Sequence, residues 1–245
     1  MHVLVTRPVQ DAEPLKTWLE EFGCLVSLAP LIETVANDIS ADSLDGATSL
    51  IATSRNALAA LAGSRARAAG IELPVYVVGS GTAARAREMG FQQVREGGGR
   101  AEDLVPLLAA EGSAGRRLIY LRGDVLAFDL EAALAERDVN VVPVPAYRSV
   151  EAKALPHDVI KALQTGGIDA VTLMSPRTAR VWARLIAALP SPVQLSGATY
   201  LCLSNRVAEA LGSLARPGKV LVASQPNLEE MFALIKRLAA SSKAE

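Results

Sequence analysis

Short apolar segments alternate with helical segments along the whole chain, and this alternation constrains the fold more than any other feature of the sequence. Strands separated by helices form parallel sheets with helices packed on their faces. The expected strands are 2–6, 24–30, 49–54, 75–79, 91–96, 117–122, 140–147, 169–175, 199–204 and 219–224. Helices are expected to begin near Asp11, Asn56, Thr82, Ala101, Phe128, Pro156, Thr178, Asn205 and Asn227. The sequence therefore predicts an α/β fold.

The strand and helix units occur twice, but in a different order. Segment 3–34 parallels 118–149, segment 50–62 parallels 171–185, segment 75–98 parallels 200–224, and segment 100–108 parallels 227–235. This order indicates a discontinuous first lobe, 1–35 plus 152–245, and an inserted, circularly permuted second lobe, 37–148. The chain would cross between the lobes twice, at linkers near 33–38 and 147–153. Two crossings predict a hinge and a cleft between the lobes that closes around a ligand.

Each lobe is expected to be a flavodoxin-like, five-stranded parallel sheet with the strand order 2-1-3-4-5. Ligands bind such sheets beyond the carboxyl ends of the strands, at the switch point between strands one and three. The residues at these points are Arg7, Ser175 and Arg177 in the first lobe, and Arg122, Thr53, Ser54 and Asn56 in the second. Arginines beside helix starts bind anions well, so the pattern predicts an anionic ligand.

Charge and composition exclude several classes of function. The 245 residues are 50% hydrophobic and carry a formal net charge of −1, which argues against a nucleic-acid-binding surface. The start of the chain lacks a signal-peptide pattern, and no apolar run has the length of a membrane span. Cys24 and Cys202 are isolated, and so are His2 and His157, so neither a metal site nor a catalytic triad is predicted. We expect a cytoplasmic protein without a metal.

The stretch "GSGTAA" at 79–84 resembles a dinucleotide-binding turn, because it follows a strand and opens a helix. It does not lie in the first unit of its lobe, however, and Glu96 follows it too early for the acidic residue of that motif. A short turn of small residues is the favoured interpretation. A nucleotide-dependent α/β enzyme stays an alternative, and so does a non-catalytic two-lobed binding module for an anionic small molecule.

A tyrosine at the second crossover is the strongest candidate for chemistry. The segment "VPVPAYRSV" at 142–150 places Tyr147 where the chain leaves the second lobe. Its counterpart at the first crossover, "VSLAPLIET" at 26–34, contains no tyrosine. A residue needed only for the hinge would be expected at both exits, so the asymmetry favours a functional role for Tyr147.

The ordered set of motifs resembles the uroporphyrinogen-III synthase family across essentially the whole chain. The segments that carry the resemblance are "VLVTRP", "LAPLIET", "IATSRNAL", "VYVVGSGTAARAREMGF", "LIYLRGD", "VPVPAYRS" and "LMSPRTARVW". The resemblance implies an enzyme of tetrapyrrole biosynthesis that works without metal or organic cofactor. Such an enzyme closes linear hydroxymethylbilane to uroporphyrinogen III with inversion of ring D, through an azafulvene and a spiro-pyrrolenine. It also implies a monomer that binds an anionic tetrapyrrole and makes at most a transient contact with hydroxymethylbilane synthase.

The resemblance assigns roles to individual residues. Tyr147 matches the family tyrosine that assists loss of the hydroxyl group as water. Hydroxyl groups that face the substrate match Ser54, Thr82 and Ser175. Two places depart from the family pattern: Arg55-Asn56 stands where Pro-Arg is common, and Val207 stands where a threonine is expected. Ser204 and Asn205, just before Val207, are the candidates to replace that contact.

Overall fold

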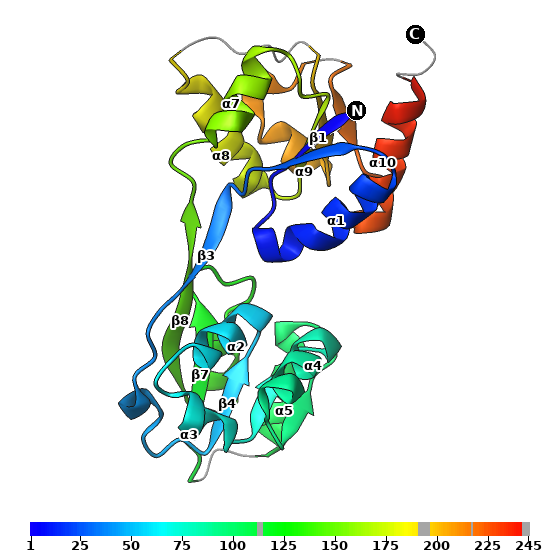
Figure 1. The fold of residues 1–245 in the computed structure, drawn as a ribbon. Coiled ribbons are helices and arrows are strands. Elements are labelled where there is room, and N and C mark those ends of the chain that lie inside the picture. The colour runs from blue at the N-terminus through cyan, green and yellow to red at the C-terminus, as the bar shows by residue number, and fades with distance from the viewer. Residues whose placement is uncertain (112–114, 191–196, 217, 242–245) are drawn as a thin grey trace. The chain divides into compact units, whose positions relative to one another are not determined.

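The computed structural model describes residues 1–111, 115–190, 197–216 and 218–241. The chain divides into two compact units, each with its own core. Unit 1 comprises Met1–Glu33 and Val150–Glu245, and unit 2 comprises Thr34–Ser149. Figure 1 shows that each unit is a sheet covered by helices on both faces. Within the described part of the chain, no helix combines the length and the apolar character that crossing a bilayer requires.

Unit 1 contains a parallel sheet in the order β11-β10-β9-β1-β2. Its strands are β1 His2–Val5, β2 Leu25–Leu28, β9 Ala170–Leu173, β10 Thr199–Cys202 and β11 Val220–Val222. Its helices are α1 Val9–Glu21, α7 His157–Gln164, α8 Pro176–Ala187, α9 Asn205–Glu209, η3 Gly212–Leu214 and α10 Leu228–Ser241. Successive strand side chains point to opposite faces, and they divide the core accordingly. One face packs against α7, α8 and α9, and the other packs against α1 and α10.

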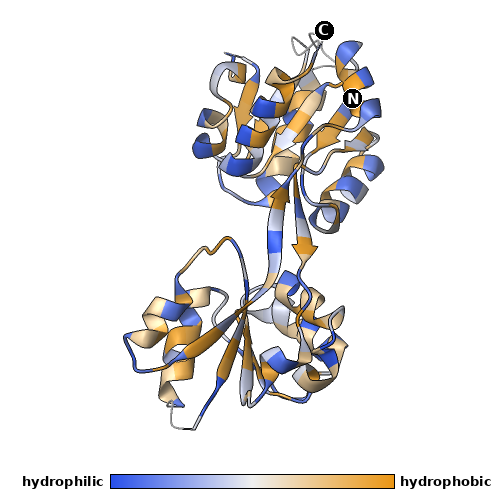
Figure 2. Ribbon diagram, turned by 90° about the vertical axis from the view of Figure 1, so that its left-hand side faces the viewer, coloured by the Kyte–Doolittle hydropathy of each residue, from blue (hydrophilic) through white to orange (hydrophobic). Residues whose placement is uncertain are grey.

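Unit 2 contains a sheet in the order β3-β8-β7-β4-β5-β6. Its strands are β3 Ile32–Ala36, β4 Ser49–Ala52, β5 Val75–Val77, β6 Val94–Glu96, β7 Leu118–Gly123 and β8 Val141–Glu151. Its helices are η1 Ala41–Leu44, α2 Arg55–Ala62, α3 Arg67–Ile71, α4 Ser80–Met89, η2 Ala101–Asp103, α5 Leu104–Ala110 and α6 Leu130–Ala135. One face of this sheet packs against α2 and α4, and the other packs against α5 and α6. Figure 2 shows the hydrophobic strands inside each unit and hydrophilic positions on the helices outside.

The predicted fold class and strand order are confirmed. Both β2-β1-β9-β10-β11 and β8-β7-β4-β5-β6 follow the expected order 2-1-3-4-5, and each contains parallel strand pairs. These two arrangements place the starts of α2 and α8 beside the switch points, because each helix follows the third strand of its sheet.

The prediction of five strands in the second lobe was wrong, because β3 adds a sixth strand beside β8. The Asn37 N–H donates to the Ala146 carbonyl at 2.8 Å, and the Ala152 N–H donates to the Leu31 carbonyl at 3.0 Å. The residue numbers rise along one strand as they fall along the other, so β3 and β8 are antiparallel. Much of each segment expected to be a linker is therefore hydrogen-bonded strand.

Candidate functional site

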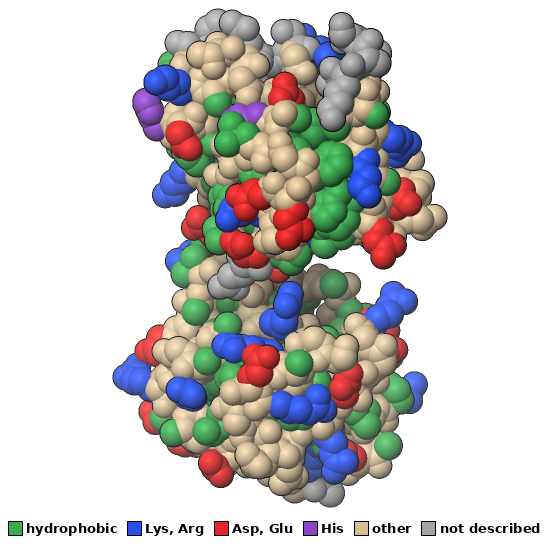
Figure 3. All heavy atoms as spheres, turned by 45° about the vertical axis from the view of Figure 1, so that its right-hand side comes forward, with side chains coloured by type: hydrophobic (Ala, Val, Ile, Leu, Met, Phe, Trp, Pro, Cys, Tyr) green, Lys and Arg blue, Asp and Glu red, His purple; other side chains and the backbone are tan. Residues whose placement is uncertain are grey.

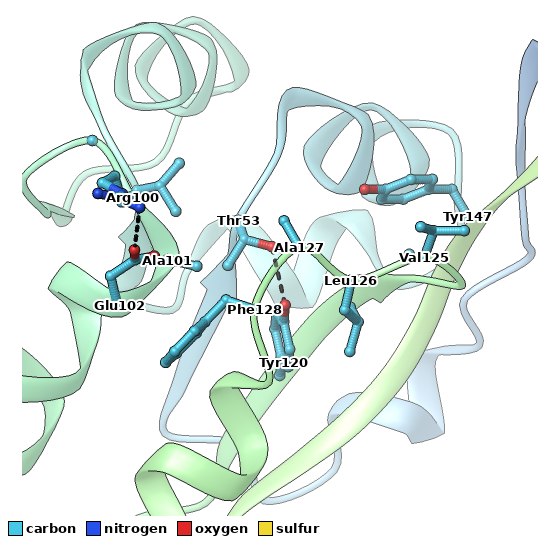
Figure 4. Close-up of a pocket in the computed structure, with 13 residues that line it drawn as sticks. Thr53, Arg100, Ala101, Glu102, Tyr120, Val125, Leu126, Ala127, Phe128 and Tyr147 are labelled. Carbon is cyan, nitrogen blue, oxygen red and sulfur yellow. Dashed lines mark hydrogen bonds and ion pairs between the residues drawn. The ribbon is translucent and has the colours of Figure 1, made fainter. Parts of the chain in front are cut away.

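A cavity of about 410 Å³ lies in unit 2 at the carboxyl ends of its central strands. Thr53 follows β4, Val78 follows β5, Gly123 ends β7, and Tyr147 lies in β8. Segments 99–102 and 125–128 form the remaining walls (Figure 4). This is the edge of an open α/β sheet at which ligands are expected to bind.

A β-bulge aims Tyr147 toward the helices α2 and α4. Arg122 of β7 pairs with Pro145 of β8, but the next residue of β7, Gly123, pairs with Tyr147. Ala146 is therefore an extra residue in β8, and a bulge of this kind reverses the alternation of side chains along a strand. As a result Tyr147 packs on the same core cluster as Val142, Val144 and Ala146. Strict alternation would have placed it on the opposite face, with Val141.

Gly123 leaves the space that the Tyr147 ring occupies. A Cβ atom at Gly123 would lie 2.6 Å from Cζ, 2.7 Å from Cε2 and 2.8 Å from Oη of Tyr147. Carbon atoms in favourable contact are about 3.5–4.0 Å apart. Any side chain at this position would therefore displace the ring.

Ser54 connects the start of α2 to Tyr147. Its backbone is extended, and its Oγ accepts a hydrogen bond from the Ala57 N–H at 3.2 Å, so Ser54 is the N-cap of α2. The same hydroxyl donates to Tyr147 Oη at 3.0 Å. Ser54 and Tyr147, which the sequence predicted separately, thus contact each other directly.

A second hydroxyl pair, Tyr120 with Thr53, lies in the same cavity. Tyr120 Oη and Thr53 Oγ1 are 3.1 Å apart, and Figure 4 draws this hydrogen bond. Tyr120 is only 1% exposed, and burial raises its pKa, so this phenol stays neutral. Tyr120 was missing from the predicted site residues. The pairing of β4 with β7 would have indicated that Tyr120 lies near Thr53. Ile51 pairs with Tyr120, and Thr53 follows Ile51 by two residues and so lies on the same face of the sheet.

Three further predicted residues of unit 2 lie near the carboxyl ends of its strands. Arg122 Nη1 lies 2.5 Å from Glu131 Oε1 on α6, and both side chains are half-buried. Asn56 Nδ2 donates to Thr34 Oγ1 at 3.4 Å. Thr82 lies in the first turn of α4 and is 6% exposed. These side chains surround the switch point, whereas Tyr147 lines the cavity itself.

In unit 1, the start of α8 brings Ser175 and Arg177 together. Ser175 is the N-cap of α8, since its Oγ accepts from the Thr178 N–H at 3.1 Å. Arg177 Nε donates to Glu151 Oε1 at 3.1 Å, and Arg184 Nη1 lies 3.0 Å from the other oxygen of that carboxylate. The hydrogen bond from Arg177 is the main cause that lowers the pKa of Glu151.

The other predicted residues of unit 1 lie at the same edge of its sheet. Arg7 is half-buried in the turn after β1. Ser204 occupies the N-cap position of α9, but its side chain makes no capping bond there, and Asn205 is exposed. Val207 is 1% exposed within the core.

Comparison with known proteins identifies the family. A family model described as uroporphyrinogen-III synthase HemD matches residues 13–233. The chain belongs to the uroporphyrinogen-III synthase family. A curated relative, uroporphyrinogen-III synthase of Synechococcus elongatus, is 27% identical over 205 residues, which cover 76% of this chain and 74% of the relative.

Solved structures of uroporphyrinogen-III synthases share the fold. That of Helicobacter pylori has a TM-score of 0.67 at 20% identity, and the match covers 97% of this chain and 99% of that one. A mutant from the extremely thermophilic bacterium Thermus thermophilus has a TM-score of 0.53 at 21% identity, and the match covers 98% of this chain and 99% of that one.

In this member of the uroporphyrinogen-III synthase family, the first glycine of "GSGTAA" has a packing explanation. Gly79 is the N-cap of α4, and a Cβ atom there would lie 3.1 Å from the α-carbon of Gly99. The glycine therefore permits two backbone segments to approach closely. This contact supports the interpretation as a short turn of small residues.

Proposed function

We propose that this chain is a uroporphyrinogen-III synthase that closes linear hydroxymethylbilane to uroporphyrinogen III, with loss of water and inversion of ring D. The family match over residues 13–233 supports the reaction. The observation that carries the chemical assignment is the Tyr147 side chain, which lines the cavity at the carboxyl ends of the strands.

Tyr147 is the proposed proton donor for the leaving hydroxyl group. The terminal C–O bond breaks, the oxygen takes the proton of Tyr147 and departs as water, and the pyrrole nitrogen supplies the electron pair. The phenolate then takes the pyrrole N–H proton, which leaves a neutral azafulvene and restores Tyr147. A phenol is protonated at neutral pH and can serve as a general acid, which typically contributes about 10²–10⁴-fold.

The proposed substrate carries an acetate and a propionate on every ring, so binding requires many hydrogen-bond donors. We assign its carboxylates to Arg7, Arg122 and Arg177, and to the polar groups at the helix starts, Asn56, Thr82, Ser175, Ser204 and Asn205. Between residues 34 and 149 every basic side chain is an arginine, and none is a lysine. Arginine suits this task, because its planar group binds a carboxylate with two parallel hydrogen bonds. Figure 3 shows basic side chains on the drawn face of unit 2, interspersed with acidic ones.

The isomer ratio of the product tests this proposal. Porphobilinogen and a deaminase would generate hydroxymethylbilane in the presence of the folded chain, and the oxidised products would be separated by chromatography. We expect isomer III with the wild-type chain and isomer I, from spontaneous closure, without it. A product that stays entirely isomer I would refute the proposed function.

Tyr147→Phe tests the proton donor separately. We expect a kcat lowered by about 10²-fold, at the low end of general-acid effects because the substrate also loses water spontaneously. An unchanged kcat and isomer ratio would refute the role of Tyr147 but not the function. A monomeric state, a cytoplasmic location and a transient contact with hydroxymethylbilane synthase stay predictions from the sequence.

A further inference from the structure

The Ser54 hydroxyl has a defined direction. Its oxygen accepts the hydrogen bond from the Ala57 N–H, at 3.2 Å, that caps α2. A backbone N–H can only donate, so the proton of Ser54 is not used in the cap. That proton points at Tyr147 Oη, 3.0 Å away. The cap thus leaves the proton of Ser54 available, and in the bond to Tyr147 the Ser54 hydroxyl is the donor.

The direction of Ser54 determines in turn where the Tyr147 proton can point. A phenol has one proton, which lies near the ring plane, and an oxygen that can accept. Because that oxygen accepts from Ser54, the proton of Tyr147 must point away from Ser54. Figure 4 shows the hydroxyl end of Tyr147 directed toward the side of the cavity on which Thr53 lies. The proton is therefore available to a group bound in the cavity.

We propose that Ser54 is a positioning residue that acts through Tyr147, rather than a residue that binds substrate itself. This inference rests on the proposed function. The hydrogen bond from Ser54 holds the Tyr147 proton toward the leaving hydroxyl group. It also stabilises the negative charge that develops on Oη as the proton leaves, and the bond from Ala57 to Ser54 strengthens it, because linked hydrogen bonds polarise one another.

Two other features of unit 2 restrict the same side chain. The bulge at Ala146 turns Tyr147 toward α2. The ring lies so close to Gly123 that a side chain at Gly123 would collide with it. Backbone pairing, ring contact and hydroxyl contact thus each fix a different part of Tyr147. Such convergence is expected where a reacting atom must be held within a fraction of an ångström.

A double-mutant cycle tests the positioning role. We expect Ser54→Ala to lower kcat at least about tenfold and to change KM by no more than about twofold. Ser54→Thr keeps both the capping oxygen and the hydroxyl donor, so we expect its kcat to be close to that of the wild-type chain. In a Tyr147→Phe background, Ser54→Ala should have no further effect on kcat, because the hydroxyl through which it acts is gone. Asn227→Ala is the matched control, because it also removes a helix cap. Asn227 Oδ1 accepts a hydrogen bond from the Glu230 N–H at 2.9 Å at the start of α10. Loss of this cap should leave kcat unchanged.

A spectroscopic measurement distinguishes the failure of this inference from the failure of the proposed function. The chain would be labelled with ¹³Cζ-tyrosine, and the NMR signal of Tyr147 would be assigned by its loss in Tyr147→Phe. We expect the chemical shift of this signal to change in Ser54→Ala but not in Asn227→Ala. An unshifted signal would overturn the inference, whatever the activity. Equal losses of kcat from Ser54→Ala in the wild-type and Tyr147→Phe backgrounds would overturn it as well, with the function intact. Absence of isomer III from the wild-type chain would overturn the proposed function.

Discussion

Replacing Gly123 with alanine is the sharpest perturbation of this site, because it adds one carbon atom at a single defined place. The three heavy atoms nearest to the new Cβ would all belong to Tyr147, at 2.6, 2.7 and 2.8 Å. Gly123 does not have a positive φ, so its backbone accepts an alanine. The consequence of Gly123→Ala should therefore be a displaced ring rather than a misfolded strand.

The size of the effect follows from these distances. Relief of the contact to about 3.5 Å requires the ring to move by about 1 Å. A shift of this size is large enough to break the hydrogen bond from Ser54 to Tyr147, which is now 3.0 Å long. Overpacking of this kind costs about 1–3 kcal/mol of unfolding free energy, and a misplacement of about 1 Å costs about 10²-fold in rate.

Two measurements with two controls check this expectation. Urea unfolding should show a stability loss for Gly123→Ala, and turnover of hydroxymethylbilane should show a kcat near that of Tyr147→Phe. Gly197→Ala is the matched control, since a Cβ at Gly197 would meet nothing within 4 Å. In a Tyr147→Ala background, Gly123→Ala should cost no stability. A wild-type kcat in Gly123→Ala, or an equal stability loss in both backgrounds, would refute the reasoning.

Three further predictions concern unit 1. The pKa of Glu151 is lowered mainly by the bond from Arg177, so the wild-type chain should be more stable than Glu151→Gln when Glu151 is ionised. Urea unfolding at a series of pH values should show this difference in full above pH about 4.5 and show it disappear as the pH falls below that value. A difference that grows toward low pH would contradict the prediction. Cys202 is 0% exposed and burial raises its pKa to about 12, so its thiol should react slowly. Iodoacetamide at pH about 8 should therefore label Cys24 in the folded chain well before Cys202, as measured by peptide mass spectrometry. Equal labelling rates would contradict this. Val207→Thr buries a hydroxyl group in an apolar cluster, so it should lower the free energy of unfolding, measured with urea, by about 1–3 kcal/mol. It should leave kcat unchanged. Unchanged stability would contradict this and show that the hydroxyl group has a hydrogen-bond partner.

The sequence predicted the features that depend on local pattern. Alternation of strands and helices, together with the order of the repeats, was sufficient for the strand order of both sheets. Helices were expected to begin near Asn56 and Thr178, and α2 and α8 begin within two residues of these positions, each after a capping serine. Each of these features is determined within a few residues or by a repeat, so it can be read without knowing any distant contact.

The features that escaped prediction depend on partners far away in the chain. β3 was missed because its polar sequence, "IETVA", becomes a strand only beside β8, which follows more than a hundred residues later. The bulge at Ala146 depends on the register between β7 and β8, so alternation within β8 alone would have pointed Tyr147 to the wrong face. The role of Tyr120 in the cavity likewise depends on its pairing with β4.

The two units share a topology, yet the positions of unit 1 that correspond to Gly123 and Tyr147 cannot hold a tyrosine in this way. Segments 3–34 and 118–149 align without a gap, and this alignment places Pro8 opposite Gly123 and Ile32 opposite Tyr147. A proline carries the Cβ atom that would collide with the ring. The hydroxyl of Ser175, the counterpart of Ser54, lies 2.8 Å from Thr178 Oγ1 within its own helix. The shared topology thus accounts for the capped helix starts in both units, whereas the proposed chemistry depends on a glycine, a bulge and a hydroxyl bond that belong to unit 2.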